Sequence, residues 1–281
     1  MVRASVLLVC LVLTGCGESP VWLGPPAPPP ATETAASGVG RVSGRVYGVG
    51  AIPGIDDFRT VFVSADFRPV SETRPNPLRP RVRPADLAVA GAWVSSPTPC
   101  AIRDADSTLD IHIDDDRIAF ADRPEGSVLV VVPPGTTARI RSTGTRFQML
   151  RGTGRNGFTV PLMRDGSGAS RCLAEADLIE LTNPAGAWWQ RAWVVVGDPA
   201  TNSITGIDGA YELSGLAAGR QEIVVRVPHP GVRKRDRNPD VGAIARMWYE
   251  PMIEVRLTVD VPATGSLKLD IPVDLSSLKA P

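Results

Sequence analysis

The side chains that could bind a transition metal or act as a catalytic base are few in this sequence. It contains two histidines, His112 and His229. Its four cysteines are Cys10, Cys16, Cys100 and Cys172. A copper centre needs imidazoles and a thiolate that converge, and a cysteine nucleophile needs a histidine base beside it. Neither histidine has a cysteine or a second histidine at ligand spacing, so we expect both to be structural or surface residues.

The N-terminus gives one cysteine a clear chemical context. Arg3 precedes a short apolar run over residues 5–13, and Leu13-Thr14-Gly15-Cys16 follows. This is the pattern of a bacterial lipoprotein signal peptide, so we predict that residues 1–15 are removed and that Cys16 carries diacylglycerol and palmitate. An ordinary signal peptide with an incidental cysteine is the alternative. Gly17, not Asp, follows Cys16, which in a Gram-negative cell favours lipid-anchored placement in the outer membrane.

Residues 16–40 have the composition of a tether. Prolines dominate residues 25–30, and residues 31–40 are small and polar. Such a segment cannot form a hydrophobic core. At about 3 Å per residue, its proline-rich part would hold a following domain tens of Å from a membrane.

Cys100 and Cys172 remain in the part of the chain predicted to be exported. An oxidising compartment favours disulfides, and this pair would close a loop of about 70 residues, for which the chain-entropy account gives about 4 kcal/mol of stabilisation. We therefore predict a Cys100–Cys172 disulfide. Two buried free thiols are the alternative.

Two charged clusters could bind ions. Asp104, Asp106 and Asp110 have the spacing of a calcium loop, to which residues 114–116 could add carboxylates, but the glycine and the closing glutamate of such loops are missing. We expect a turn held by aspartate hydrogen bonds, with calcium as the alternative. The second cluster is basic, and its members are Arg233, Lys234, Arg235 and Arg237. It is either a solvated loop or a ligand surface for an anionic envelope partner, such as a lipopolysaccharide phosphate or an acidic glycan.

The overall composition argues against several classes of protein. Lysine plus arginine and aspartate plus glutamate both number 30, so the net charge is zero and no overall basic field favours nucleic acid. Aromatic residues make up 5% of the chain, which is low for a sugar-binding cleft. The Gly-x-Ser-x-Gly pattern of many hydrolases is absent. We therefore predict that the protein is not an enzyme, although a carboxylate pair assembled in space remains open.

Short alternating or apolar segments broken by Gly, Pro, Asn and Asp dominate the chain, which is typical of β-strands. The predicted strands are residues 42–47, 60–65, 87–95, 108–113, 127–132, 137–142, 157–162, 178–181, 191–196, 210–213, 221–227, 253–261 and 266–273. Residues 68–84 carry five prolines and are predicted to be an extended surface excursion, while residues 240–247 offer at best a short helix. We predict an all-β fold, an antiparallel β-sandwich.

Two motifs resemble known families. Residues 187–194 read Ala-Trp-Trp-Gln-Arg-Ala-Trp-Val and, with residues 131–142, resemble bacterial cupredoxin-like domains. Residues 205–219, with Asp208-Gly209 near their start, resemble a turn of carboxypeptidase-regulatory-like (transthyretin-like) modules. The resemblance implies a cupredoxin-like sandwich over residues 41–197 and a carboxypeptidase-regulatory-like module over residues 198–281, with a seam near residues 197–205. One continuous domain is the alternative.

The cupredoxin-like resemblance also shows what is missing. The copper-binding cysteine, histidine and methionine of that family would fall at Asn183, Ala187 and Gln190, and the first histidine would fall within residues 145–149. Asparagine, alanine and glutamine are poor copper ligands. The resemblance therefore implies a degenerate frame without a metal or another cofactor. For Asp208-Gly209 we expect a mechanical role, in which aspartate caps a tight turn and glycine supplies a positive φ.

These expectations combine into a membrane-anchored envelope lipoprotein that acts as a non-enzymatic binding or scaffolding module. Its expected partners are the membrane and an envelope protein or glycan, without nucleic acid. A metal-binding or electron-transfer protein with an atypical site is the alternative, and a hydrolase is a more distant one.

Overall fold

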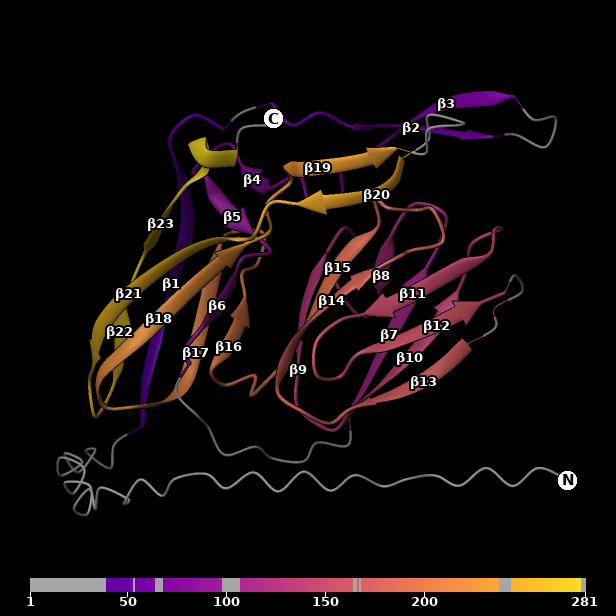
Figure 1. Ribbon diagram of the computed structural model, residues 1–281. Coiled ribbons are helices and arrows are strands. Elements are labelled where there is room, and N and C mark those ends of the chain that lie inside the picture. Colours follow the sequence, from indigo (N-terminus) through magenta and orange to yellow (C-terminus); the bar gives the residue numbers. More distant parts are fainter. Residues whose placement is uncertain are drawn as a thin grey trace, which may run out of the picture. The chain divides into compact units, whose positions relative to one another are not determined.

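The computed structural model describes residues 39–52, 54–63, 68–97, 107–163, 166, 168–237 and 244–278. The predicted signal peptide, Cys16, nearly all of the predicted tether, Cys100 and residues 101–106 lie outside these ranges. Inside them the chain forms β-strands and a short 3-10 helix, η1 (Leu275–Leu278) (Figure 1). This confirms the predicted all-β class.

The middle of the chain forms one β-sandwich, which we call the middle sandwich. Its strands are β7 (Thr108–Ile113), β8 (Ile118–Phe120), β9 (Leu129–Val132), β10 (Thr136–Ser142), β11 (Gln148–Gly152), β12 (Phe158–Leu162), β13 (Gly168–Leu173), β14 (Asp177–Thr182) and β15 (Arg191–Val196). The described strands form two sheets, in the orders β13-β10-β7-β8 and β12-β11-β14-β15-β9. Most neighbours are antiparallel, whereas β7 with β10 and β9 with β15 are parallel.

Strand alternation builds the core of the middle sandwich. In β10, Ala138 and Ile140 are buried while Arg139 and Arg141 are exposed, because successive side chains of a strand point to opposite faces of the sheet. Buried side chains of both sheets, such as Ile140 and Leu150, belong to one apolar cluster. The two sheets therefore share a single core.

Strands from both ends of the described chain form a second sandwich, which we call the terminal sandwich. They are β1 (Val39–Val49), β4 (Arg81–Arg83), β5 (Ala88–Ala90), β6 (Trp93–Ser95), β16 (Asn202–Ile204), β17 (Ala210–Ala217), β18 (Gly219–Val227), β21 (Ile253–Val261), β22 (Ser266–Lys268) and β23 (Ile271–Asp274). In one sheet β1 pairs antiparallel with β17 and β5 and parallel with β22 and β23 (Figure 1). The other sheet has the order β16-β6-β18-β21.

The strand pairing divides the chain differently from the predicted ranges 41–197 and 198–281. Strands β1, β5 and β6 lie in the first range, but β1 and β6 pair with strands of the second. Alternation indicates which face of a strand is buried and does not indicate which strand lies beside it, so the sequence pattern could not reveal this. The middle sandwich is therefore an uninterrupted insertion into the terminal sandwich, and the predicted seam falls where the chain passes from β15 to β16.

Strand β1 lies at the centre of the terminal sandwich. Its Val42 and Val46 are fully buried. A Cβ atom placed on Gly44 would lie 1.9 Å from the carbonyl oxygen of Leu269. Glycine in a strand often marks such a close approach of another backbone, and here no other residue leaves the necessary space.

The turn predicted at Asp208-Gly209 is present between β16 and β17. Gly209 has a φ of 74°, and Asp208 Oδ1 accepts a hydrogen bond from the Ala210 N–H at 3.0 Å. The Gly209 carbonyl accepts a hydrogen bond from the Val46 N–H at 2.9 Å. The turn therefore reverses the chain and also fastens it to β1, which confirms the expected mechanical role.

Two segments differ from their predictions because strand pairing outweighs weak local propensity. The predicted surface excursion at residues 68–84 contains β3 (Pro69–Arg74), which pairs with β2 (Phe58–Val63), and also β4. The segment suggested as a short helix at residues 240–247 overlaps β20 (Ile244–Tyr249), which pairs with β19 (Val232–Arg237). Both segments thus contribute strands to antiparallel pairs, β2 with β3 and β19 with β20.

A separate apolar cluster joins the two sandwiches. Trp93 of β6 belongs to it together with Leu129 of β9 and with Trp193 and Val195 of β15. Trp93 is buried. Burial of large aromatic side chains contributes strongly to such contacts, so the insertion is packed against its host.

Candidate functional site

Three of the positions to which the cupredoxin-like resemblance assigns copper ligands are joined directly by hydrogen bonds. Asn183, which follows β14, donates through Nδ2 to Gln148 Oε1 at 2.6 Å and to Gln190 Oε1 at 2.9 Å. Gln148 begins β11 and Gln190 immediately precedes β15. All three side chains are buried, with 3% or less of their surface exposed. We call this group the amide network. The sequence placed the first histidine position only within residues 145–149, and in this range it is Gln148 that bonds to Asn183.

The hydrogen-bonding capacity of Asn183 is fully used. In addition to its two donated bonds, its Oδ1 accepts hydrogen bonds from the N–H groups of Ala185 at 3.0 Å and Met149 at 3.3 Å. Fully bonded buried amides fix a unique arrangement, whereas an unpaired one is costly. A type-1 copper centre requires imidazole nitrogens and a thiolate, and the amides present here do not fit such a centre.

The turn at residues 114–116 anchors the amide network. Gln190 Nε2 donates to the Asp114 carbonyl at 2.7 Å, and Gln148 Nε2 donates to Asp115 Oδ1 at 2.8 Å. Burial alone would raise the pKa of Asp115, but hydrogen bonds from the hydroxyl and N–H of Thr145 and from the next backbone N–H outweigh it, so the pKa is lowered. An ionised carboxylate therefore accepts the bond from Gln148.

The other carboxylates of this acidic run also serve the turn. Asp114 Oδ1 accepts hydrogen bonds from the N–H groups of Asp116 and Arg117, both at 2.7 Å, which is an aspartate-capped turn. Asp116 forms an ion pair with Arg74. In the parts of the chain that the structure describes, no group of three or more His, Cys, Asp or Glu side chains could hold a metal ion. Asp104 and Asp106 lie outside those parts, so the calcium alternative stays untested.

Aromatic side chains from two hairpins cover the loop that carries Asn183. The Trp188 ring centroid lies 5.0 Å from that of Phe58 in β2, and the Trp188 carbonyl accepts a hydrogen bond from Tyr249 Oη in β20 at 2.8 Å. Ala187, at the position of the second histidine of the family, is buried in the same cluster. Phe58, Ala187, Trp188 and Tyr249 therefore pack in one cluster beside the loop that carries Asn183. We call this cluster the aromatic cover.

Arg191 connects the aromatic cover to the middle sandwich. Its guanidinium lies 4.6 Å from the centroid of the Trp193 ring and 4.4 Å from that of Tyr249, a cation–π geometry. Its Nε also forms an ion pair with Glu180 Oε1 at 2.5 Å. Burial raises the pKa of Tyr249, so its hydroxyl remains a hydrogen-bond donor at neutral pH.

The predicted basic ligand surface lies on a strand and not in a loop. Its residues Arg233, Lys234, Arg235 and Arg237 all belong to β19 and are exposed. Lys234 Nζ lies 3.2 Å from Asp236 Oδ1 and 4.6 Å from the centroid of the Trp248 ring. Because successive side chains of a strand point to opposite faces, the neighbouring Arg233, Lys234 and Arg235 do not all lie on one face of β19. Their role as an anion surface stays a prediction.

The cysteine and histidine predictions fare unequally. Cys172 lies on β13 with an exposed thiol and has no disulfide partner among the described residues. Cys100 is not among them, so the Cys100–Cys172 disulfide stays a prediction, whereas burial of Cys172 is excluded. His229 Nδ1 accepts a hydrogen bond from the Gly231 N–H at 2.9 Å, and its Nε2 lies 3.4 Å from the Ser277 carbonyl, which is the expected structural role. His112 is half-buried on β7.

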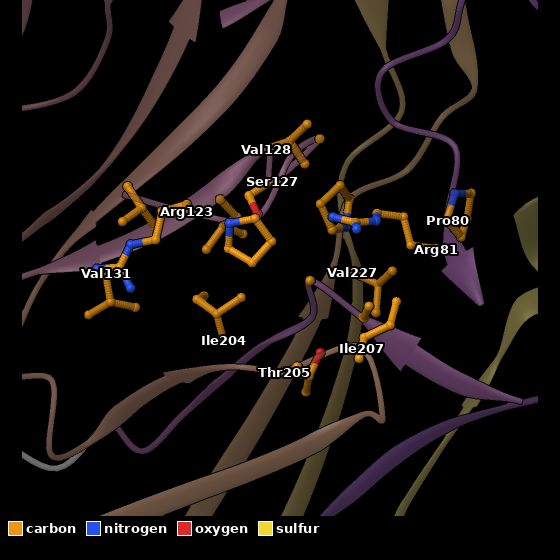
Figure 2. A pocket seen from close by; sticks show the side chains of 18 of the residues that line it. Pro80, Arg81, Arg123, Ser127, Val128, Val131, Ile204, Thr205, Ile207 and Val227 are labelled. Carbon is orange, nitrogen blue, oxygen red and sulfur yellow. The ribbon is translucent and has the colours of Figure 1, made fainter. Parts of the chain in front are cut away.

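A pocket with a volume of about 540 Å³ lies between the two sandwiches. Figure 2 shows apolar side chains around it from both, including Val128 and Val131 on one side and Ile204 and Val227 on the other. The edge strands β9 and β16 approach each other here. Its apolar lining, the size of the cavity and its position between two packed units are typical of small-molecule sites.

Two arginines on the pocket wall were not identified from the sequence. Arg81 of β4 extends between Val128 and Val227, and Arg123 lies beside Val131 (Figure 2). Within the described part of the chain, neither guanidinium forms a hydrogen bond or an ion pair. Arg79, which also lines the pocket, is instead paired with Asp57 at 2.9 Å. Because Arg81 and Arg123 belong to different sandwiches, no local pattern could bring them together.

No protein-family model matches the sequence, and no curated protein matches it significantly. Among solved structures, the chain is similar to the Cu(I) form of an amicyanin variant, with 17% identity, coverage of 38% of this chain and 98% of that chain, and a TM-score of 0.27. It is also similar to a purple cupredoxin from Nitrosopumilus maritimus, with 16% identity, coverage of 33% of this chain and 100% of that chain, and a TM-score of 0.24. A third similar structure is a chain of a heme-copper terminal oxidase dimer, with 13% identity, coverage of 36% of this chain and 72% of that chain, and a TM-score of 0.27.

These similarities concern the fold of about a third of the chain, and they leave its function to be inferred from its own residues. None of the three bears on the transthyretin-like resemblance. Among the described residues, no helix is long and apolar enough to cross a membrane.

Proposed function

We propose that this chain is a non-enzymatic binding or scaffolding module of the bacterial cell envelope. The observation that carries the proposal is the amide network of Gln148, Asn183 and Gln190. In the cupredoxin-like interpretation these side chains stand at ligand positions, and hydrogen bonds between amides take over the task of tying three segments together. A buried centre whose polar atoms are used internally stabilises a frame and leaves function to its surfaces.

The carboxypeptidase-regulatory-like interpretation of residues 205–219 belongs to the same proposal. The contacts of the Asp208-Gly209 turn are made within the chain, to Ala210 and to Val46. A turn engaged in this way holds two strands in register. Both family resemblances are therefore interpreted as frames that present loops and a pocket.

Placement at the envelope rests on the signal-peptide pattern that ends at Cys16. In the mature protein the lipid on Cys16 anchors the chain and the proline-rich segment up to residue 40 acts as the tether. Substitution Cys16→Ala should move the protein from the membrane fraction to the soluble fraction. A Cys10→Ala variant, which changes a cysteine inside the signal peptide, should remain with the membranes. Retention of the Cys16→Ala protein on membranes would contradict the anchor.

Copper retention separates the proposal from the electron-transfer alternative. The purified mature protein is loaded with copper, desalted, and analysed for metal content and for visible absorbance. We expect far less than one copper per chain and no intense thiolate-to-copper band, because amides occupy the ligand positions. A Cys172→Ser variant serves as the control for adventitious binding at the exposed thiol. Stoichiometric copper that survives this substitution would overturn the binding-only proposal.

A partner of the module can be sought in the envelope itself. Cross-linking in intact cells followed by affinity capture should recover a defined protein or glycan with the wild-type chain and should lose it when the partner-facing surface is changed. The test variant is Arg233→Gln/Arg235→Gln on β19, which should lose the partner. The control is Arg139→Gln/Arg141→Gln on β10, which should keep it, and all four side chains are exposed. Turnover of a hydrolase substrate by the purified protein would instead support the enzymatic alternative.

A further inference from the structure

We infer that the pocket between the two sandwiches binds a single-chain amphipathic anion, that is, an apolar chain with a carboxylate or phosphate head. This inference rests on the proposed binding function and names the chemical class of one ligand. It follows from three properties of the pocket: an apolar wall of sufficient size, two arginines without a partner among the described residues, and engagement of the Thr205 and Asn202 side chains in the fold.

The apolar wall provides the site for the ligand's chain. Val128, Leu129 and Val131 come from the middle sandwich, while Ile204 and Val227 come from the terminal sandwich. Ile207 is 62% exposed although it also lines the pocket. Covering such apolar surface is favourable, and a cavity of about 540 Å³ is within the range of small-molecule sites.

Arg81 and Arg123 line different parts of the pocket wall, and each offers a site for an anionic head (Figure 2). Guanidinium groups match carboxylate and phosphate oxygens through paired N–H donors. Arg81 and Arg123 lack an ion-pair partner among the described residues, while other arginines nearby, such as Arg79 and Arg83, are paired with aspartates. An anion that contacts Arg81 or Arg123 therefore need not displace an internal partner.

Two neutral polar side chains on the wall, Thr205 and Asn202, are engaged in the fold, whereas the Ser127 hydroxyl forms no hydrogen bond among the described residues. Thr205 Oγ1 donates to the Val89 carbonyl at 2.7 Å and accepts from the Ala92 N–H at 2.9 Å. Asn202 Oδ1 accepts from Trp93 Nε1 at 3.0 Å. Apart from the Ser127 hydroxyl, a neutral sugar or amide head would find few free side-chain partners there, so the pocket should favour an anionic head.

Binding of amphiphiles that share one chain length tests this selection. The mature protein is titrated calorimetrically with dodecanoate, dodecyl phosphate, dodecyl maltoside and dodecyltrimethylammonium, each below its micelle concentration, and with acetate as a head without a tail. We expect saturable binding of dodecanoate or dodecyl phosphate, at least tenfold weaker binding of the neutral and cationic amphiphiles, and no detectable binding of acetate. The two anionic heads distinguish a carboxylate ligand from a phosphate ligand.

Variants locate the binding. Arg81→Gln/Arg123→Gln should weaken anion binding about tenfold or more, which corresponds to the loss of charge-assisted hydrogen bonds at exposed positions. Ile207→Glu, which places a carboxylate at the pocket, should weaken it as well. The matched control is Arg139→Gln/Arg141→Gln, which removes the same charge from exposed positions of β10 and should bind like the wild type.

The outcomes either support or overturn the inference. Equal binding of all four amphiphiles, equal loss in the control variant, or no binding of either anion would overturn it. If no amphiphile binds while cross-linking in cells still captures a defined envelope partner, the pocket inference fails and the proposed function stands. If anions bind as expected but the copper test succeeds in forming a stoichiometric centre, the pocket inference stands and the binding-only proposal fails.

Discussion

The amide network and the pocket between the sandwiches hold their polar side chains in opposite states. Asn183 makes four hydrogen bonds inside the chain, whereas Arg81 and Arg123 make none with side-chain atoms in the described residues. The first group is buried, and the second lines an open cavity. The difference teaches that a polar group saturated by its own chain builds the frame, while one left unsaturated beside an apolar wall is available for a ligand.

The largest expected effect tests the structural side of this comparison. Asn183→Ala leaves Gln148 Oε1, Gln190 Oε1 and two backbone N–H groups without their partner in a buried site, and each such group costs about 1–3 kcal/mol. We expect a loss of about 3 kcal/mol or more in the free energy of unfolding, measured by urea denaturation. Asn156→Ala is the control, because Asn156 bonds to Glu175 in an exposed turn, and it should lose less than about 1 kcal/mol. Equal losses in the two variants would contradict the special role of the network.

The aromatic cover should give the next effect. Tyr249→Phe removes the hydrogen bond to the Trp188 carbonyl at a half-buried position and should cost about 1 kcal/mol. Tyr211→Phe is a matched variant, because Tyr211 Oη donates to the Leu269 carbonyl at 2.7 Å in the terminal sandwich. Amide hydrogen exchange should accelerate around residues 187–191 in the Tyr249 variant and not in the Tyr211 variant. Faster exchange around these residues in both variants, or in neither, would show that the Tyr249 hydrogen bond does not stabilise this loop specifically.

A smaller effect should appear as a dependence of stability on pH. The pKa of Asp115 is lowered in the folded state from its ordinary value of 3.8, so its contribution to stability is complete above that value and is lost as the pH falls through the folded-state pKa. Urea denaturation between pH 5 and pH 2 should therefore show a steeper loss for the wild type than for Asp115→Asn. Parallel curves for the two proteins would mean that the carboxylate does not support the amide network in its ionised form.

The smallest effect is expected at the pocket. Arg81→Gln/Arg123→Gln should change the free energy of unfolding by less than about 0.5 kcal/mol, since exposed side chains without partners contribute little to stability. Thermal unfolding of the ligand-free protein measures this. A loss of 2 kcal/mol or more would place the two arginines on the structural side of the comparison.

The sequence predicted those features that local patterns encode. Alternation over residues 137–142 predicted the strand that the structure shows as β10, and Asp208-Gly209 predicted a tight turn. These two successes share one cause, which is that each depends on neighbours in the chain. The cupredoxin-like assignment of Asn183 and Gln190 to ligand positions stays an interpretation, whereas the hydrogen bond between their side chains is an observation.

The features that escaped prediction depend on residues far apart in the chain. Strand β20 forms because β19 pairs with it, although residues 240–247 had suggested a short helix. Arg81 and Arg123 share a pocket only because the insertion packs against its host. Gln148 is distinguished from its neighbours by its bonds to Asn183 and Asp115. Tertiary pairing overrides local propensity in each of these cases.

The place of β1 in the terminal sandwich has a consequence for the order in which the protein can mature. A chain that emerges N-terminus first presents β1 long before β17, β22 and β23 exist, whereas the middle sandwich is complete once β15 has emerged. Contacts between distant strands form slowly, and unpaired strand edges invite aggregation in the interval. Newly synthesised β1 therefore needs protection, for example by a chaperone, until its partner strands have been synthesised. Truncation after β15 should leave a folded middle sandwich whose N-terminal extension contains β1 without its partner strands and depends on a chaperone.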